Sequence, residues 1–244
     1  MDLDMMSLRR ALIAENYIFD EDFLVSLFVS LKLKKPVLIE GAAGVGKTEV
    51  AKVLASVFDV ELIRLQCYEG IDESRALYEW NYHKQLLEIQ VRQSTDHSDK
   101  TSLFDREYLL ERPLLRAIST DTPAVLLIDE IDKADEEFEA FLLELLSDFQ
   151  VSIPELGTIR AKSIPIVILT SNGTRELSEA LRRRCTYMYI NYPSLEKEIE
   201  IIRARAGRVS ERLAREIALA VQYIRKNLDL YKPPSIAEAI DWAN

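Results

Sequence analysis

A glycine-rich stretch near the start of the chain joins an apolar run to a helical pattern. It reads Glu40-Gly41-Ala42-Ala43-Gly44-Val45-Gly46-Lys47-Thr48, after the strand-like residues 36–39 and before residues 49–55. Glycine allows a loop to wrap so closely that its backbone N–H groups point at a phosphate. The N-terminus of the following helix adds partial positive charge at the same place. The pattern G-x-x-x-x-G-K-T between a strand and a helix therefore predicts a phosphate-binding P-loop.

The predicted loop offers side chains as well as backbone groups. Lys47 can reach the outer phosphates of a nucleotide, and the Thr48 hydroxyl can ligand Mg²⁺. A glycine-rich turn that ends by chance in Lys-Thr is the plain alternative, and the flanking strand and helix signals disfavour it. The residues that we expect to bind the nucleotide are Gly41, Ala42, Ala43, Gly44, Val45, Gly46, Lys47, Thr48 and Glu49.

A second predicted strand ends in two carboxylates. The apolar run 124–128 leads directly into Asp129 and Glu130, which is a Walker B pattern. A continuous apolar run is typical of a buried parallel strand, and ligands of open α/β sheets bind beyond the carboxyl ends of such strands. We therefore expect Asp129 to hold Mg²⁺ beside the P-loop, and Glu130 to orient and polarise an attacking water. A helix N-cap or a salt-bridged pair is the structural alternative at these two positions.

Two further stretches end in polar groups. The apolar run from Ile164 leads to Asn172, whose amide could hold the attacking water or contact the γ-phosphate. A turn asparagine before Gly173 is the alternative there. The predicted helix 176–184 ends in three arginines, residues 182–184. Cations are favourable at any helix C-terminus, so this triplet does not indicate a site by itself.

Composition indicates a globular chain and excludes several classes. The sequence has 244 residues, of which 48% are hydrophobic and 30% charged, with a formal net charge of −10. The negative charge argues against a nucleic-acid partner, and no apolar run reaches the roughly 18–20 residues of a membrane span. The acidic start lacks the basic and apolar regions of a signal peptide. The two cysteines, Cys67 and Cys185, lie far apart and form no disulfide framework, so we expect a cytoplasmic protein. Neither they nor His83 and His97 have metal-ligand spacing, so we expect no zinc site.

Periodicity predicts the elements that position these residues. We expect helices over 3–15, 20–34, 49–55, 74–92, 135–149 and 176–184, and strands over 36–39, 59–66, 124–128, 164–170 and 187–190. Residues 104–118 predict two helices divided at Pro113, and residues 94–100 an exposed polar loop. Residues 151–160 alternate around a Pro/Gly turn, which favours a β-hairpin. From residue 193 onward, three helical patterns follow one another without a strand.

The order of these motifs resembles an AAA+ ATPase. Walker A, Walker B, a hairpin, a strand that ends in Asn172 and a C-terminal helical region follow one another along residues 15–244. The resemblance implies an α/β P-loop NTPase fold with a parallel-sheet core. It places the nucleotide-binding core, with an N-terminal helical linker, in residues 1–192, and a small all-α lid in residues 193–244.

Shorter motifs resemble the MoxR branch of that superfamily. Residues 35–41 and 129–134 are typical of the branch. Residues 66–70, 156–161 and 170–177 resemble its CoxD-type members, which are associated with maturation of carbon monoxide dehydrogenase and related molybdenum hydroxylases. The resemblance implies a homo-oligomeric ring, usually a hexamer, a von Willebrand factor A domain partner protein and a metalloenzyme client. In the family, the inserted helix after Gln66 and the hairpin lie on faces exposed for client handling.

The resemblance also assigns roles to single residues. Asn172 matches sensor 1, and Arg184 falls where the family places its arginine finger, with Arg183 as the neighbouring candidate. Such an arginine completes the ATP site of the next subunit and stabilises transition-state charge. The catalytic residues would then be Lys47, Glu130, Asn172 and Arg184, with ATP as substrate and with Mg²⁺ held by Thr48 and Asp129.

Two departures from the family pattern stand out. Many lids carry a sensor 2 arginine at the start of a late helix, where this chain reads Pro234-Ser235-Ile236-Ala237-Glu238-Ala239. Sensor 2 is therefore weak or absent, or another residue such as Lys232 replaces it. The chain also ends at Asn244, where the family lid continues, so we expect a truncated lid.

The predicted function is ATP hydrolysis that remodels a client protein. By resemblance, this would be chaperone-like help in metal-cofactor insertion or in maturation of a molybdenum hydroxylase. A P-loop kinase is one alternative, which the Asn172 strand and the C-terminal helices disfavour. A DNA-associated AAA+ protein or a non-hydrolysing binding module is the other, which the net negative charge and Glu130 disfavour.

Overall fold

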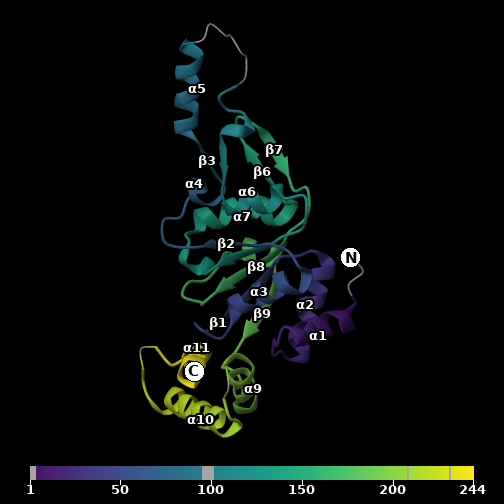
Figure 1. Ribbon diagram of the computed structural model, residues 1–244, viewed down its shortest axis with the longest axis vertical. Helices are drawn as coiled ribbons and strands as arrows, with labels where there is room; N and C mark the ends of the chain where they lie inside the picture. The colour runs from purple at the N-terminus through teal and green to yellow at the C-terminus, as the bar shows by residue number, and fades with distance from the viewer. Residues whose placement is uncertain (1–3, 95–101, 208, 231) are drawn as a thin grey trace.

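A five-stranded parallel sheet forms the centre of the protein (Figure 1). The computed structural model describes residues 4–94, 102–207, 209–230 and 232–244. The strand order is β2-β5-β8-β1-β9, and every neighbouring pair is parallel. The strands are β1 (Val37–Gly41), β2 (Leu62–Gln66), β5 (Val125–Asp129), β8 (Ile166–Ser171) and β9 (Thr186–Ile190). The predicted α/β P-loop fold is confirmed.

Helices cover both faces of this sheet. Strand β5 is buried at every position, as its continuous apolar run predicts. Its alternate residues point to opposite faces, so Val125 and Leu127 pack against one helical layer and Leu126 and Ile128 against the other. The first layer is formed by α1 (Met5–Ala14), α2 (Glu21–Leu33) and α3 (Lys47–Phe58), and the second by α6 (Pro113–Ser119) and α7 (Glu136–Asp148).

The segment before α6 differs from the prediction. A single helix was expected over 74–92, but the chain forms α4 (Glu73–Ala76), β3 (Tyr78–Trp80) and α5 (Tyr82–Ser94). The first of the two helices expected over 104–118 is also wrong. In its place lie the 3₁₀ turn η1 (Arg106–Tyr108) and β4 (Leu109–Glu111), which pairs antiparallel with β3.

The β3–β4 pairing explains both errors. It joins residues 78–80 to residues 109–111, and it buries Trp80, Tyr108 and Leu109 in the core. A tertiary contact of this kind outweighs local helical spacing. The second expected helix is present as α6, which begins at Pro113, where a missing N–H carries no penalty. Apart from Ser94 at the end of α5, the predicted polar loop lies outside the described residues.

The hairpin and the arginine-bearing helix are both present. Strands β6 (Gln150–Ile153) and β7 (Gly157–Arg160) pair antiparallel, with Gly157 at a φ of 76° in the turn. Helix α8 (Glu179–Arg184) is shorter than the 176–184 expected. It begins after Ser178 because that side chain accepts a hydrogen bond from the Leu181 amide and caps the helix there.

Three helices follow the sheet at the C-terminal end. They are α9 (Leu195–Arg205), α10 (Glu211–Asn227) and α11 (Ile236–Ala243), and they share an apolar cluster of their own. Figure 1 shows them together beyond the β1–β9 side of the sheet, at the opposite end of the molecule from α5. The division into a core over 1–192 and a lid over 193–244 stays our proposal. No helix among the described residues is long and apolar enough to cross a membrane.

Candidate active site

The loop between β1 and α3 needs its glycines for two physical reasons. Gly44 and Gly46 adopt positive φ angles of 75° and 96°, which glycine reaches without strain. A Cβ on Gly41 would lie 2.2 Å from the Ile190 carbonyl oxygen, and a Cβ on Gly44 would lie 2.2 Å from the Ser235 Cβ. The loop is therefore closely packed between β9 and the start of α11. Its last glycine, Gly46, is the N-cap of α3, so the helix N-terminus lies at the loop.

Lys47 is the first residue of α3, and its side chain reaches back to this loop, with only 6% of its surface exposed. Its Nζ donates to the Gly41 and Ala42 carbonyl oxygens at 2.7 Å each and to Asn172 Oδ1 at 2.8 Å. An ammonium has three donors, and here all of them are directed at oxygen atoms. Burial lowers the pKa of Lys47, and the carboxylates nearby oppose that shift. The arrangement can exchange a carbonyl oxygen for a phosphate oxygen without moving the lysine far.

Asp129, at the end of β5, is 3% exposed and is held from three sides. Its Oδ1 accepts from the Thr170 hydroxyl and, at 3.1 Å, from the Thr48 hydroxyl, while Arg64 pairs with its Oδ2. A hydroxyl and a carboxylate oxygen this close suit Mg²⁺, which usually takes one or two carboxylates together with substrate phosphates. The described residues contain no group of three or more His, Cys, Asp or Glu that could hold a metal. Thr48 and Asp129 therefore fit a phosphate-bound Mg²⁺ and not a metal held by the protein alone.

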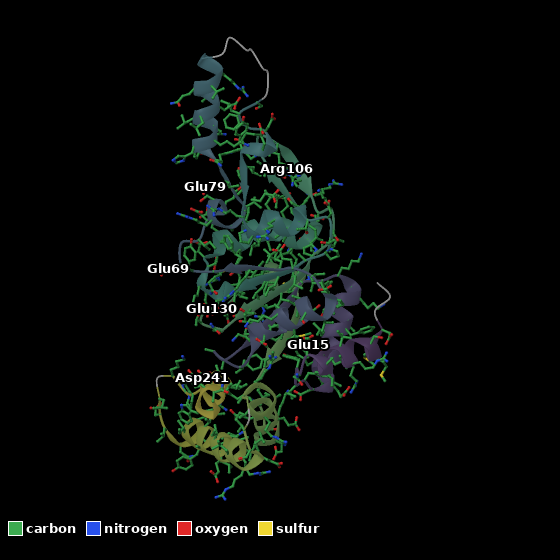
Figure 2. The ribbon with its side chains drawn as sticks, viewed as in Figure 1. Glu15, Glu69, Glu79, Arg106, Glu130 and Asp241 are labelled. Carbon is green, nitrogen blue, oxygen red and sulfur yellow. The ribbon has the colours of Figure 1, made fainter. Side chains whose placement is uncertain are left out.

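Glu130 adopts a left-handed backbone conformation, with a φ of 56°. Its amide donates to the Thr170 hydroxyl at 2.9 Å. Its carboxylate pairs with Lys133 and accepts from Gln66 Nε2 at 2.9 Å and from Asn172 Nδ2 at 3.3 Å. Figure 2 shows Glu130 on the side of the core that faces the C-terminal helices. A residue other than glycine has a strained backbone in this conformation, and such residues are common at functional sites.

Asn172 connects the two charged groups described above. Its carbonyl oxygen accepts from Lys47, and its amide nitrogen donates to Glu130. The loop that carries Asn172 is held by Asp132. The Asp132 carboxylate accepts hydrogen bonds from the backbone N–H of Asn172 at 3.1 Å, from the backbone N–H of Thr174 at 3.1 Å and from the Thr174 hydroxyl at 2.6 Å. Burial tends to raise the pKa of Asp132, but these hydrogen bonds outweigh it and hold the pKa below its ordinary value.

Sequence reasoning did not single out Asp132 as a site residue. Its side chain is nearly fully buried and accepts hydrogen bonds from two residues of the loop that carries Asn172. The signal was present in the sequence, because an acidic residue two positions after Glu130 is part of the Asp-Glu-Ile-Asp-Lys-Ala stretch. Its role could not be assigned there, because its partners lie about forty residues further along the chain.

A cavity of about 240 Å³, which we call the P-loop pocket, brings the predicted residues together. Its walls are Ala43, Gly44, Gly46, Lys47, Thr48, Glu49, Asp129, Glu130, Thr170, Asn172 and Ala237. Gly41, Ala42 and Val45 belong to the same loop but do not line the pocket. The P-loop, the two carboxylates and Asn172 therefore meet at the carboxyl ends of β1, β5 and β8, which are neighbours in the sheet.

A second cavity of about 850 Å³, which we call the large cavity, adjoins the first. The two share Gly44, Gly46, Glu49 and Ala237. The large cavity is lined by residues between Asn16 and Ser26, by residues 187–194, and by residues of α9 and α11. Two ion pairs join its walls, Lys197 to Asp20 at 2.7 Å and Arg205 to Glu49 at 2.9 Å. Sequence reasoning missed this cavity, since no short motif marks it.

The three arginines of α8 lie elsewhere. Arg184 donates to the Ala180 carbonyl oxygen at 3.0 Å and to the Ser147 hydroxyl, and Arg183 pairs with Glu179 on the surface. Arg182 lies 5.6 Å from the centre of the Tyr187 ring. None of these three arginines is among the described residues that line the two cavities. The chain does not bring Arg184 into its own site, and an action on a neighbouring subunit stays a prediction.

The start of α11, where the sequence lacks a sensor 2 arginine, lies at the P-loop pocket. The first turn of α11 places Ala237 in the wall of the P-loop pocket, so a methyl group stands where a longer side chain would enter. Lys232, the substitute considered from the sequence, pairs with Glu238 at 3.3 Å. It is not among the described residues that line either cavity.

Known proteins match most of this chain. Gas vesicle ATPase GvpN1 of Halobacterium salinarum is 25% identical over 212 residues, which cover 82% of this chain and 59% of that protein. The uncharacterized protein YojN of Bacillus subtilis is 29% identical over 203 residues, which cover 80% of this chain and 60% of that protein. This chain therefore spans about three fifths of the length of these curated relatives.

A solved structure and a family model complete the comparison. The crystal structure of a "putative ATPase" from Cytophaga hutchinsonii superposes with a TM-score of 0.56 at 15% identity, covering 97% of this chain and 62% of that one. At that identity the likeness shows a shared fold. The model of the AAA domain, dynein-related subfamily, matches residues 36–185, which include the P-loop, both carboxylates and Asn172. The chain belongs to this family of nucleotide-binding AAA domains.

Proposed function

We propose that this protein hydrolyses ATP to ADP and phosphate in the P-loop pocket, with Mg²⁺ as cofactor. The observation that carries the proposal is the contact of Asn172 with both Lys47 and Glu130, beside the Thr48–Asp129 pair. These groups are a phosphate binder, a base, an amide that touches both, and a hydroxyl–carboxylate pair suited to Mg²⁺. Membership of the AAA domain family and the likeness to a gas vesicle ATPase support it.

The residues of the P-loop pocket bind the nucleotide and activate the water, and Arg184 of the next subunit would stabilise the transition-state charge. The N–H groups of the loop and Lys47 bind the phosphates. Thr48 and Asp129 would hold Mg²⁺, which would neutralise the charge that develops on the phosphate oxygens. Glu130 orients a water molecule and takes its proton as the oxygen attacks the γ-phosphorus, and ADP leaves. Asn172 fixes both Glu130 and Lys47 during that step. No nucleophilic side chain is needed, so no covalent intermediate forms.

Glu130→Gln tests the proposal. The amide cannot take a proton, so we expect turnover to fall by about 10²–10⁴-fold while ATP still binds. Glu136→Gln, an exposed change at the start of α7, is the matched control and should leave turnover unchanged. Phosphate release and equilibrium ATP binding are measured on the same preparations. The assignment fails if Glu130→Gln keeps most of the wild-type turnover.

We further propose that hydrolysis drives remodelling of a client protein. The sequence resemblance to CoxD-type MoxR proteins supports this, with a metalloenzyme such as a molybdenum hydroxylase as client and a von Willebrand factor A domain protein as partner. Helix α5 extends from the core at the end opposite the C-terminal helices, with Tyr82, Leu86, Leu87 and Val91 exposed, as an element that handles a client would need (Figure 1). We propose a cytoplasmic location for this work.

A ring is the assembly that this proposal requires, with Arg184 reaching the ATP site of the next subunit. The mass of the protein in solution, with and without ATP, tests it, and we expect ATP to favour a hexamer. Arg184→Ala should keep nucleotide binding but lose turnover, and mixing it with Lys47→Ala should restore part of that turnover. A failed restoration would favour Arg183, and a fully active monomer would favour the kinase-like alternative.

A further inference from the structure

The C-terminal helices reach the two cavities with few cations. In the part of the chain that the structure describes, Lys197 and Arg205 are the cations from these helices that line a cavity, and both lie on α9. Helix α11 contributes Ala237 to the P-loop pocket, and Lys232, which pairs with Glu238, is not among the described residues that line it. Any positive charge that these helices offer to a nucleotide must therefore come from α9.

Arg205 lines the large cavity and pairs with a residue at the junction of the two cavities. Its Nη2 lies 2.9 Å from Glu49 Oε1. Glu49 is in the first turn of α3, two residues after Lys47, and it lines both the P-loop pocket and the large cavity. Lys197 is placed differently, since its partner Asp20 lines only the large cavity.

The charges at this junction favour a phosphate as the ligand of Arg205. A nucleotide that fills both cavities passes its inner phosphate through the junction, close to the Glu49 carboxylate. That carboxylate repels a phosphate unless cations neutralise it. Lys52 pairs with it at 3.2 Å from its own helix, and Arg205 is the cation that pairs with it from the wall of the large cavity. A guanidinium also matches phosphate oxygens with two parallel donors. Because Arg205 is partly exposed, it can turn from Glu49 to the phosphate at little cost.

We propose that Arg205 binds the inner phosphate of the nucleotide, which is the one bonded to the ribose. It supplies the positive charge that Ala237 of α11 cannot supply. The inference rests on the proposed function and deepens it, because it names the group by which the C-terminal helices hold the ligand. ADP and ATP share the inner phosphate, so Arg205 contributes to both affinities. A sensor 2 arginine that reached the outer phosphate would favour ATP alone.

A different reading treats the Arg205–Glu49 pair as a simple latch between α9 and the core. The two readings make opposite predictions for Glu49. If the pair is a latch, loss of either partner weakens nucleotide binding equally. If Arg205 is a phosphate ligand, Glu49→Gln removes a competing carboxylate and leaves the arginine free for the nucleotide.

Equilibrium titration with fluorescent ADP and ATP analogues separates these readings. We expect Arg205→Ala and Arg205→Gln to weaken both nucleotides by at least about tenfold, the loss of a charge-assisted hydrogen bond. Glu49→Gln removes the competing carboxylate, so it should bind both nucleotides measurably more tightly than the wild type does. Arg203→Ala is the matched control, because Arg203 lies on the same helix and pairs with Glu211 of α10. It should bind as the wild type does.

Several results would overturn the inference. They are an Arg205→Gln variant that binds like Arg203→Ala, an equal weakening in Arg205→Gln and Glu49→Gln, or a loss confined to ATP. Thermal unfolding of each variant checks that it is folded, and the glutamine variant decides the question if the alanine variant is not. Lys47→Ala separates this inference from the function beneath it. If the wild type binds neither nucleotide, or binds no better than Lys47→Ala, the proposed function itself fails.

Discussion

The walls of the P-loop pocket come mostly from the P-loop and the ends of neighbouring strands, whereas those of the large cavity come mostly from segments before β1 and after β8. In the pocket, Asp129 ends β5 and Asn172 follows β8, and these two strands are neighbours in one sheet. In the large cavity, residues 16–26 face α9 and α11, and two partly exposed ion pairs join α9 to the core, Lys197–Asp20 and Arg205–Glu49.

The difference predicts different mechanical properties. Buried hydrogen bonds between strand ends resist displacement, because each broken bond leaves an unpaired polar group. Exposed ion pairs contribute only about 0–1 kcal/mol each. The P-loop pocket is therefore preorganised, whereas the contacts that join α9 to the core across the large cavity are weak. Four substitutions probe this comparison.

The largest expected effect concerns the stability of the C-terminal helices. Arg225 and Glu198 form a two-pronged ion pair at 2.8 and 3.0 Å, with side chains 8% and 0% exposed. Arg225→Ala leaves a buried carboxylate unpaired and should lower the stability of these helices by about 3–5 kcal/mol. Trp242 fluorescence in a Trp80→Phe background measures this in urea, because the chain has two tryptophans.

The core should be untouched by that change, since its two apolar clusters are separate from that of the C-terminal helices. Arg212→Ala, which breaks an exposed pair with Glu216, is the control and should shift the free energy by less than about 0.5 kcal/mol. If Arg225→Ala makes the core and the C-terminal helices unfold together, the two regions form one cooperative unit, and the helices do not lose stability independently of the core.

The next effect concerns nucleotide affinity at the phosphate end. Lys47→Ala removes the donors now directed at Gly41, Ala42 and Asn172, and should raise the ATP dissociation constant at least about 100-fold. Arg203→Ala, an exposed change on α9, should leave it within about twofold. Calorimetric titration measures both. Equal losses would show that general positive charge, and not the preorganised pocket, carries the affinity.

A smaller effect is expected from the carboxylate that holds the Asn172 loop. Asp132→Asn leaves some of the donors of Asn172 and Thr174 unpaired, so kcat should fall by about tenfold while KM stays within about twofold. Thr174→Val removes only the hydroxyl and should cost less. A rise in KM with an unchanged kcat would mean that Asp132 supports nucleotide binding and not the position of Asn172.

The smallest effect depends on pH. Hydrogen bonds from Ser235, the first residue of the capping box of α11, lower the pKa of Glu238 to about 2 from its ordinary 4.5. A lowered pKa contributes stability that is complete above about 4.5 and is lost as the pH falls toward 2. Glu238→Gln should therefore destabilise the C-terminal helices at pH 7 by less than about 1 kcal/mol, because the side chain is 40% exposed.

That difference should narrow at pH 3.5, which lies inside the window between the two pKa values. Urea unfolding of both proteins, followed by Trp242, gives the difference at each pH. A difference that stays constant would assign the effect of Glu238 to packing and not to its charge.

The sequence predicted the phosphate end well because local rules govern it. Gly44 and Gly46 need positive φ angles, and Lys47 begins the helix that follows. An apolar run that ends in acid identifies β5, and the parallel-sheet rule then brings Asp129 and Asn172 to one edge. The same local reading failed over 74–111, where spacing suggested helices. There the β3–β4 pairing of distant residues decided the structure.

The amino-acid sequence alone determined the family fold, the P-loop and the carboxylates, because each depends on residues adjacent in the chain or on the ends of buried strands. The tertiary structure alone decided the large cavity, the hydrogen bonds between Asp132 and the Asn172 loop, and the pairing of Arg205 on α9 with Glu49 beside the P-loop. These features join side chains far apart in sequence. No spacing rule links such residues, because only the packing of helices onto the sheet brings them within reach.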